Sequence, residues 1–489
     1  MCISFRHSSC VNNYISLFII AICLPFILWA VCDILPTFDD FNTLQSPQFI
    51  PWLSAEGILP IDSFWRPWDF LFGCLLGRFP VLFPAFNHVC ILLGHTMSTI
   101  LLFKICTQLK FGSLSTNIAT LFFFFSPATL GATLACDGLN QTYAQFWGFL
   151  ALWCYMNKKY WLWPLLVFVA ALSKENGLAW AIVPPIFAYA FQLINRKQAL
   201  RDCGIGIVVA IVYFVLRLSL SISDNINNEY TDMTMMGHLK DLLQLLVYTW
   251  VPLDYMSAVY APTRNLTIVL ITALMSLPFL LILASRWRML LTRQLLLLMA
   301  CYFILVSPHL ITLVSIMHNY AALSIAAISV AALLSDKASN LKPSTSFLKY
   351  AFALFLAAAL FTDVHHYIAA RESGLLGKRL AEQVLKDGGQ PLQKVMVINI
   401  DDPDELRYSN FCVRPVDAFG WGLSVRHYSG YTWNPFICEA TFDHYDPVQV
   451  KATADSALHA GCEAVWIAGH KADSVTVIKP TQTPSLPFQ

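Results

Sequence analysis

Ionisable residues stand at turns that border long apolar stretches of this sequence. The pair Asp39-Asp40 follows the first apolar run, Asp137 lies in a short turn before Gly138, and Lys174-Glu175 separates two apolar stretches. A carboxylate in a partly desolvated cleft can have a raised pKa and act as a general base toward a hydroxyl. A lysine can bind a phosphate as a point charge. We therefore expect a carboxylate base at Asp39 or Asp40 and a phosphate contact at Lys174.

Each of these residues also has a structural interpretation. Asp39 or Asp40 can cap an interfacial helix or stay solvated, and Asp137 before a glycine is typical of a turn or an N-cap. Lys174 and Glu175 can form a local ion pair. The sequence leaves both interpretations open.

Histidines add a second set of candidates. His88 and His95 are seven residues apart and share one face of a predicted helix. A histidine in a polar bundle interior is more often a hydrogen-bonding residue than a metal ligand, and the HExxH pattern of zinc hydrolases is missing. Asp39, Asp40 and Asp137 together have the chemistry of a hard-cation site. We predict that no cofactor is required, with a divalent cation as the open alternative.

Composition indicates which solvent surrounds the elements that hold these residues. The chain is 57% hydrophobic and only 12% charged, against about 25% charged residues in soluble domains. This deficit indicates that lipid surrounds most of the chain. The net charge of +1, without a basic stripe, argues against a nucleic-acid partner.

The apolar runs predict an α-helical polytopic membrane protein with about eleven transmembrane helices. The first run, 14–32, lacks a small-residue cleavage site and is expected to be retained. The other runs are 81–106, 114–134, 139–156, 160–173, 176–194, 203–222, 265–285, 294–312, 318–335 and 347–364. Lysines and arginines concentrate in alternate loops, which places the N-terminus in the cytoplasm. On this topology 238–262 is an interfacial or re-entrant segment and the C-terminal tail is outside.

The residues after 364 have a different character. Lys394 to Asp401 and Ala464 to Ala468 have the pattern of buried strands, and Val450 to Ala460 has helical spacing. We therefore divide the chain into a membrane module, 1–364, with a first external loop at 33–79, and a small extracytoplasmic α/β domain, 365–489. Cys412, Cys438 and Cys462 would allow one disulfide in an exported tail.

Several short motifs occur in an order that resembles the GT-C superfamily of polytopic glycosyltransferases. The resemblance covers roughly 14–364 and is nearest to the branch of the protein O-mannosyltransferases and their tetratricopeptide-bearing relatives. The motifs are the acidic pair Asp39-Asp40, Phe64-Trp65-Arg66-Pro67-Trp68, His88 to His95, Ser126-Pro127, Ser173-Lys174-Glu175 and Asn319-Tyr320. The sequence departs from the family at Ile91, where an Asn is usual, and at Asn319, where an Arg is usual. The tetratricopeptide repeats are replaced by the α/β tail.

The resemblance implies roles for individual residues. Asp39 or Asp40 would be the catalytic base, while Arg66, His88, His95, Asp137, Lys174 and Glu175 would contact substrate. Similar enzymes take a sugar from a polyprenyl-phosphate carrier and work on the exoplasmic side. The resemblance thus implies inverting sugar transfer to an acceptor that is a glycolipid, a lipid-linked or other glycan, or a protein.

Two other functions remain open at this stage. One is a lipid-linked glycan flippase or transporter, and the other is a glycan polymerase or ligase. For all three we expect membrane lipids as partners and a bacterial inner-membrane location in the cell envelope.

Overall fold

The computed structural model describes residues 14–34, 66, 85–134, 138–220, 234–252, 265–310, 316–335, 344–388, 392–399, 436–442, 446–468 and 475–479. The predicted site residues Asp39, Asp40 and Asp137 lie outside this set. Most of the first loop, 33–79, does as well.

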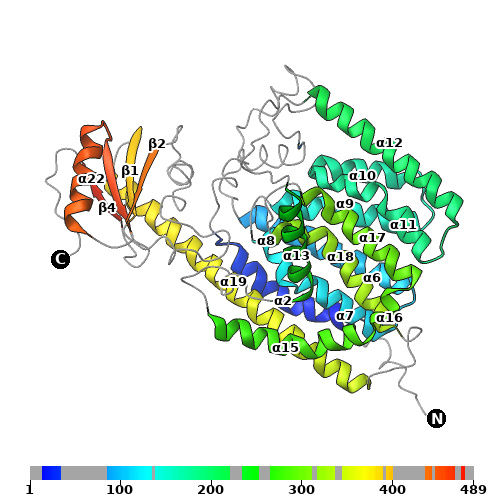
Figure 1. The fold of residues 1–489 in the computed structure, drawn as a ribbon. Coiled ribbons are helices and arrows are strands. Elements are labelled where there is room, and N and C mark those ends of the chain that lie inside the picture. Colours follow the sequence, from blue (N-terminus) through cyan, green and yellow to red (C-terminus); the bar gives the residue numbers. More distant parts are fainter. Residues whose placement is uncertain are drawn as a thin grey trace, which may run out of the picture.

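A bundle of helices forms the larger part of the described chain (Figure 1). Its first half contains α2 (Ile15–Val31), α6 (Ala85–Gln108), α7 (Ser113–Phe124), η2 (Pro127–Thr129), α8 (Leu130–Thr133), α9 (Gly138–Met156), α10 (Leu162–Ser173), η3 (Glu175–Ala181), α11 (Val183–Ala190) and α12 (Arg196–Leu220). Its second half contains α13 (Met235–Trp250), α15 (Leu266–Ser285), α16 (Trp287–Leu290), α17 (Arg293–Val306), η5 (Ser307–His309), η6 (Ile316–Asn319), α18 (Tyr320–Leu334) and α19 (Thr345–Gly388). Each of the predicted apolar runs overlaps at least one of these helices.

Five helical segments in the described part of the chain are long and apolar enough to cross a membrane. They are Ala85–Gln108, Arg196–Ser219, Leu266–Ser285, Ile316–Leu334 and Thr345–Glu372. Four shorter apolar helices accompany them: Ile15–Val31, Ser113–Phe124, Leu162–Ser173 and Arg293–His309. The chain is therefore a helical membrane protein. The larger number of spans, and their orientation, stay predictions.

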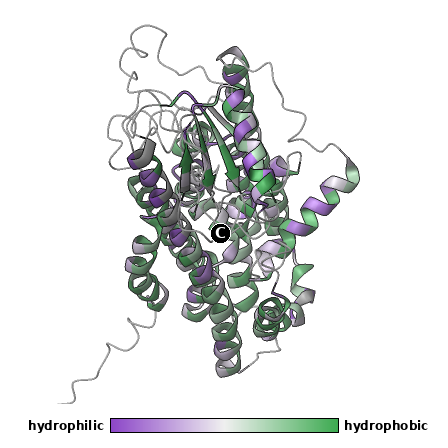
Figure 2. Cartoon of the chain, turned by 90° about the vertical axis from the view of Figure 1, so that its left-hand side faces the viewer, coloured by the Kyte–Doolittle hydropathy of each residue, from purple (hydrophilic) through white to green (hydrophobic). Residues whose placement is uncertain are grey.

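The bundle is organised around α18, which is buried along most of its length. Alanines such as Ala322, Ala326 and Ala327 line this helix and are at most 2% exposed. Small side chains let neighbouring helices approach closely, which replaces the hydrophobic driving force that is missing in lipid. In contrast, α12 carries exposed Ile207, Val208, Ile211 and Val212, and the bundle's helices are mainly hydrophobic in Figure 2. A membrane environment explains this apolar exterior.

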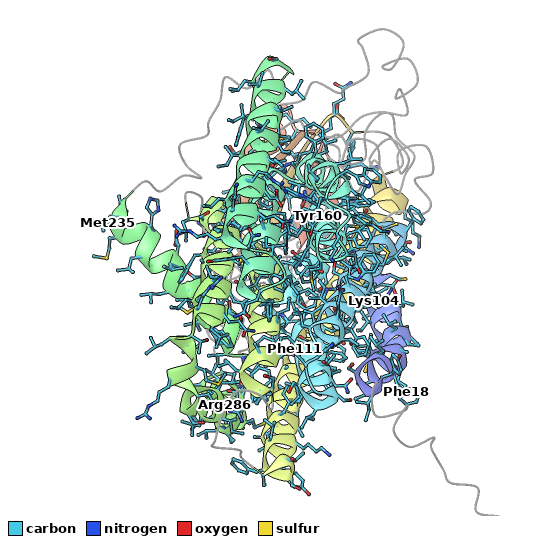
Figure 3. All side chains as sticks on the ribbon, turned by 90° about the vertical axis from the view of Figure 1, so that its right-hand side faces the viewer. Phe18, Lys104, Phe111, Tyr160, Met235 and Arg286 are labelled. Atoms are coloured by element: carbon cyan, nitrogen blue, oxygen red, sulfur yellow. The ribbon has the colours of Figure 1, made fainter. Side chains whose placement is uncertain are left out.

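The segment predicted as interfacial, 238–262, begins within the helix α13 (Met235–Trp250). Thr234 caps it by accepting a hydrogen bond from the Gly237 N–H at 3.0 Å. The helix has 16 residues and ends ahead of Pro252, so it is shorter than the roughly 20 residues that a span requires. Its Met235 end stands away from the bundle in Figure 3. The interfacial placement itself stays a prediction.

A four-stranded sheet contains the strands β1 (Lys394–Asn399), β2 (Phe436–Thr441), β3 (Ala464–Ala468) and β4 (Val475–Ile478). The strand order is β2-β1-β3-β4, with β1 parallel to β2 and β3, and β4 antiparallel to β3. The helix α22 (Pro447–His459) packs on the sheet through Val450 and Ala454. The predicted strands near 394–401 and 464–468 and the helix near 450–460 are thereby confirmed. Cys438 and Cys462 are free thiols, and Cys412 lies outside the described residues.

One continuous helix connects the bundle to the sheet. Figure 1 shows α19, 44 residues long, leaving the bundle and reaching the sheet. The predicted last span, 347–364, and the predicted domain boundary after residue 364 both fall inside this helix. Arg371 of α19 pairs with Asp33 at 2.9 Å and lies 4.2 Å from the centre of the Trp29 ring. These contacts fix the middle of α19 to the end of α2.

Candidate functional site

The 173–177 turn is built by a local break in the chain between α10 and η3. Lys174 has an extended backbone (φ −156°, ψ 141°) that ends α10 and starts η3 at Glu175. A Cβ atom on Gly177 would lie 2.5 Å from the carbonyl oxygen of Ala170. Since any larger residue would collide with backbone there, glycine allows η3 to fold back against α10.

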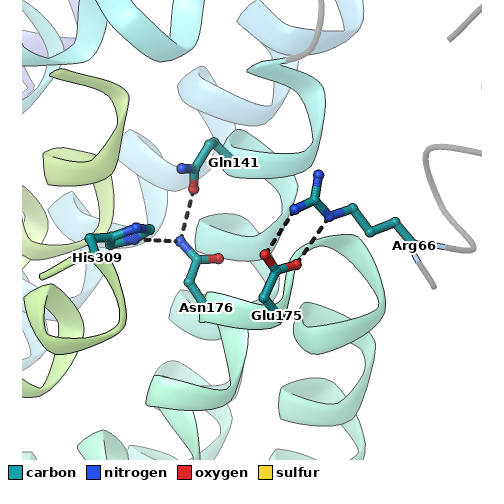
Figure 4. Close-up of polar contacts among 5 residues, drawn as sticks. All are labelled: Arg66, Gln141, Glu175, Asn176 and His309. Carbon is teal, nitrogen blue, oxygen red and sulfur yellow. Dashed lines mark hydrogen bonds and ion pairs between the residues drawn. The ribbon is translucent and has the colours of Figure 1, made fainter. Parts of the chain in front are cut away.

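Arg66 and Glu175 form a two-point ion pair across 109 residues of sequence (Figure 4). Arg66 Nε donates to Glu175 Oε2 at 3.0 Å, and Arg66 Nη2 donates to Glu175 Oε1 at 2.8 Å. Paired guanidinium–carboxylate hydrogen bonds are among the stronger polar contacts in proteins. The pair joins the predicted first loop to the 173–177 turn.

The ion pair determines the charge state of Glu175. Burial raises the pKa of this carboxyl, but the charge of Arg66, its hydrogen bonds and the charge of Lys174 outweigh burial and lower the pKa to about 2. Glu175 is therefore an anion at neutral pH. A carboxylate with so low a pKa is a weak base, so Glu175 acts as an ionic partner rather than a proton acceptor.

Three further side chains, Asn176, Gln141 and His309, extend this group of polar contacts (Figure 4). Asn176 Nδ2 donates to Gln141 Oε1 of α9 at 2.9 Å and lies 3.0 Å from His309 Nε2 of η5. His309 in turn stacks on His318, with ring centres 4.3 Å apart. We call Arg66, Lys174, Glu175, Asn176, Gln141 and His309 the turn cluster.

Lys174 is the cation at the centre of the turn cluster. Its side chain is only 9% exposed and lies within electrostatic range of Glu175, His309 and His318. Arg217 of α12 is a further cation of this region, because it lies within electrostatic range of Tyr213, which is itself within range of Arg66 and Glu175. Among the described residues the cluster thus contains two cations, Arg66 and Lys174, and one carboxylate, Glu175.

His95 lies in a different polar group. Its Nδ1 is 2.6 Å from the Tyr320 hydroxyl, and its Nε2 is 3.1 Å from the Phe124 carbonyl oxygen. Next to it, Asn319 exchanges hydrogen bonds with Thr249 and accepts one from Tyr302. We call His95, Tyr320, Asn319, Thr249 and Tyr302 the core network. Both nitrogens of His95 are used inside the protein, which favours its interpretation as a hydrogen-bonding core residue.

The structure therefore divides the predicted site residues into three groups. It brings Arg66, Lys174 and Glu175 together. His95 belongs to the core network, and His88 is completely buried in α6. Asp39, Asp40 and Asp137 lie outside the described residues, so the base and the suggested cation site stay predictions. Among the residues that the structure describes, no group of three or more His, Cys, Asp or Glu side chains is arranged to hold a metal ion.

Some polar residues of this region were not predicted from the sequence. Gln141 and Asn176 belong to the turn cluster, and Gln145 is fully buried one turn after Gln141. Asp363 in α19 is 6% exposed, and its Oδ1 accepts no hydrogen bond from the described chain. The sequence signal for them is simple: carboxamides four residues apart in the 139–156 run, and an acid beside the end of the last predicted span.

No protein-family model and no curated protein sequence matches this chain.

Proposed function

We propose that the chain is a membrane glycosyltransferase that transfers a sugar from a polyprenyl-phosphate donor to an extracytoplasmic acceptor. The observation that carries the proposal is the contact of Arg66 with Glu175 beside the buried Lys174. Arg66 lies in the predicted first loop, so this contact brings that loop to the 173–177 turn, as a site that uses residues of both would require.

In the proposed reaction Lys174 binds the donor phosphate. Asp39 or Asp40 takes the proton of an acceptor hydroxyl as its oxygen attacks the anomeric carbon. The bond from that carbon to the phosphate oxygen breaks, and polyprenyl phosphate leaves with the electron pair. Attack from the opposite face inverts the anomeric centre. Charge develops on the leaving phosphate, where a fixed buried cation is most effective.

The proposed arrangement requires no separate nucleotide-binding domain. A polyprenyl carrier is apolar and can lie between helices, so only its phosphate and sugar need polar contacts. Arg66 pairs with Glu175, and the buried Lys174 beside this pair would provide the positive charge for the phosphate. The C-terminal residues would lie on the outer side of a bacterial inner membrane, beside the acceptor glycolipid, glycan or protein.

Transfer of a radiolabelled sugar from a synthetic polyprenyl-phosphate donor by the purified protein tests this proposal. Asp39→Asn and Asp40→Asn are compared with wild type, and Asp446→Asn in the tail serves as a carboxylate control. We expect one of the first two variants to lose transfer by about 100-fold or more, with the control unaffected. Full turnover in both would remove the base assignment.

One observation favours the alternative of a lipid-linked glycan transporter. Asp363 is a buried acid inside the candidate span Thr345–Glu372, and ionisable residues within spans often mark transport pathways. Asp363→Asn separates the two functions. A transferase should keep sugar transfer in this variant, whereas a transporter should show no transfer in any form and lose movement of a fluorescent lipid-linked glycan across vesicles.

A further inference from the structure

A stripe of polar and small residues on α9 faces η3. Gln141, Gln145 and Gly148 are spaced by four and three residues and so share one helix face. At one end of the stripe Gln141 accepts a hydrogen bond from Asn176 of η3. At the other end a Cβ atom on Gly148 would lie 2.3 Å from the Trp180 ring of η3. Gln145 lies on this helix face between these two contacts.

The carboxamides along this stripe retain unused hydrogen-bonding capacity. Gln145 is 1% exposed, and neither its Nε2 nor its Oε1 has a partner in the described chain. The same holds for Gln141 Nε2 and Asn176 Oδ1. Buried amide atoms in folded proteins normally have partners, because an unpaired polar atom is unfavourable away from water. Several such atoms side by side point to a ligand that completes them.

The chemistry of the stripe selects the kind of ligand. A carboxamide offers a donor and an acceptor without charge, and a hydroxyl group does the same, so the two are complementary. Asn176 directly follows Lys174 and Glu175 and also contacts His309. Neutral hydroxyl-binding groups thus lie beside a buried cation. A sugar attached to a phosphate has hydroxyl groups beside a negative charge and so matches both the carboxamides and the cation. A lipid tail has neither.

We propose that Gln141, Gln145 and Asn176 form the subsite that recognises hydroxyl groups of the transferred sugar. The inference rests on the proposed function, for which Lys174 binds the adjoining phosphate. Gln145 makes no hydrogen bond within the described protein, so its amide is available to the sugar. Gln141 and Asn176 position each other through their mutual hydrogen bond.

Gln145→Leu tests the subsite in the full-length protein reconstituted in nanodiscs. Leucine is similar in size and cannot hydrogen-bond, and Gln145→Met is a second variant of the same kind. Thr116→Val is the matched control, because Thr116 on α7 is also buried with an Oγ that has no described partner. Binding is measured for three probes: a short-chain polyprenyl-phosphate hexose, the same polyprenyl phosphate without sugar, and an alkyl hexoside without phosphate.

We expect Gln145→Leu to weaken binding of both sugar-bearing probes by about 10-fold or more, the effect of losing hydrogen bonds to a ligand hydroxyl. Binding of sugar-free polyprenyl phosphate should stay within about twofold. The midpoint of thermal unfolding should be unchanged or higher, since leucine removes an unpaired polar group. Thr116→Val should leave all three affinities unchanged.

Other outcomes overturn the inference or separate it from the proposed function. Three outcomes would make Gln145 a structural residue while the proposed function stands. They are equal weakening of the sugar-bearing and sugar-free phosphates, unchanged binding of both hexosides, and a lower unfolding midpoint in Gln145→Leu. Binding of the alkyl hexoside alone, lost in Gln145→Leu, would retain the sugar subsite and remove the polyprenyl-phosphate donor. Wild-type protein that binds none of the probes would overturn both.

Discussion

The core network and the turn cluster are both polar groups inside an apolar helical bundle. They differ in how many of their hydrogen-bonding atoms have partners within the described protein. In the core network His95 uses both ring nitrogens, and Asn319 uses both amide atoms. The turn cluster leaves Gln141 Nε2 and Asn176 Oδ1 without described partners and contains the buried cation Lys174. A network whose polar atoms are all paired stabilises the fold, whereas a network with unpaired polar atoms can form hydrogen bonds to a ligand.

Lys174→Met, a change in the turn cluster, should reduce sugar transfer more than any change in the core network. The variant removes the buried cation while keeping most of the side-chain volume, so we expect transfer to fall about 100- to 1,000-fold. Thermal stability should change little, because Arg66 still neutralises Glu175. Lys197→Met, at an exposed position of α12, is the control. Normal transfer by Lys174→Met would remove the phosphate-binding role.

Gly177→Ala should damage the turn cluster without removing any functional group. The added Cβ would collide with the Ala170 carbonyl oxygen, so η3 must shift. We expect a loss of about 1–3 kcal/mol in the free energy of unfolding, together with reduced transfer. Gly112→Ala is the control, since no atom lies within 4 Å of a Cβ there. If Gly177→Ala keeps wild-type stability and wild-type transfer, η3 tolerates the movement.

Tyr320→Phe should affect the core network alone. Removing the hydroxyl leaves His95 Nδ1 without its partner, which we expect to lower the free energy of unfolding by about 1–3 kcal/mol. The affinity for the donor should remain at the wild-type value. Denaturant unfolding and donor titration measure the two effects. A selective loss of donor affinity would assign His95 to substrate after all.

Glu175→Gln should lower the stability of the fold, and that effect should depend on pH. The pKa of Glu175 is lowered from 4.5 to about 2 in the folded protein. Such a group stabilises the folded state above the unfolded-state pKa, and its contribution is lost as pH falls toward the folded-state pKa. Wild type should therefore exceed the variant in unfolding temperature at pH 7, and the difference should shrink between about pH 4.5 and 2. A constant difference across this range would contradict the ionic role.

The sequence predicted a large part of the fold because lipid imposes simple rules on a chain. Backbone polar groups must be satisfied within each span, so apolar runs of sufficient length predict helices. The runs near 265–285 and 318–335 match α15 and α18 closely. The end of α19 was not predictable in this way, because its last turns leave the apolar run and continue with charged residues to Gly388.

The candidate site was only partly predictable. Arg66, Lys174 and Glu175 attract attention as charges beside apolar runs, and all three were predicted to contact substrate. Gln141, Gln145 and Asn176 were not predicted, because uncharged amides are ordinary surface residues; the available signal was the spacing of Gln141 and Gln145 within an apolar run. The sequence favoured a hydrogen-bonding role for His95, and the structure supplies the partners Tyr320 and Phe124, which are distant in sequence.

The sequence by itself indicated that lipid surrounds most of the chain. It also predicted the helices and the strands of the tail, since hydrophobic periodicity is a local property. Tertiary structure alone decided which polar residues meet. Arg66 reaches Glu175 across 109 residues, and Asn176 reaches His309 across 133. Contacts between such distant residues depend on how the helices pack, and packing is set by the shapes of many side chains together.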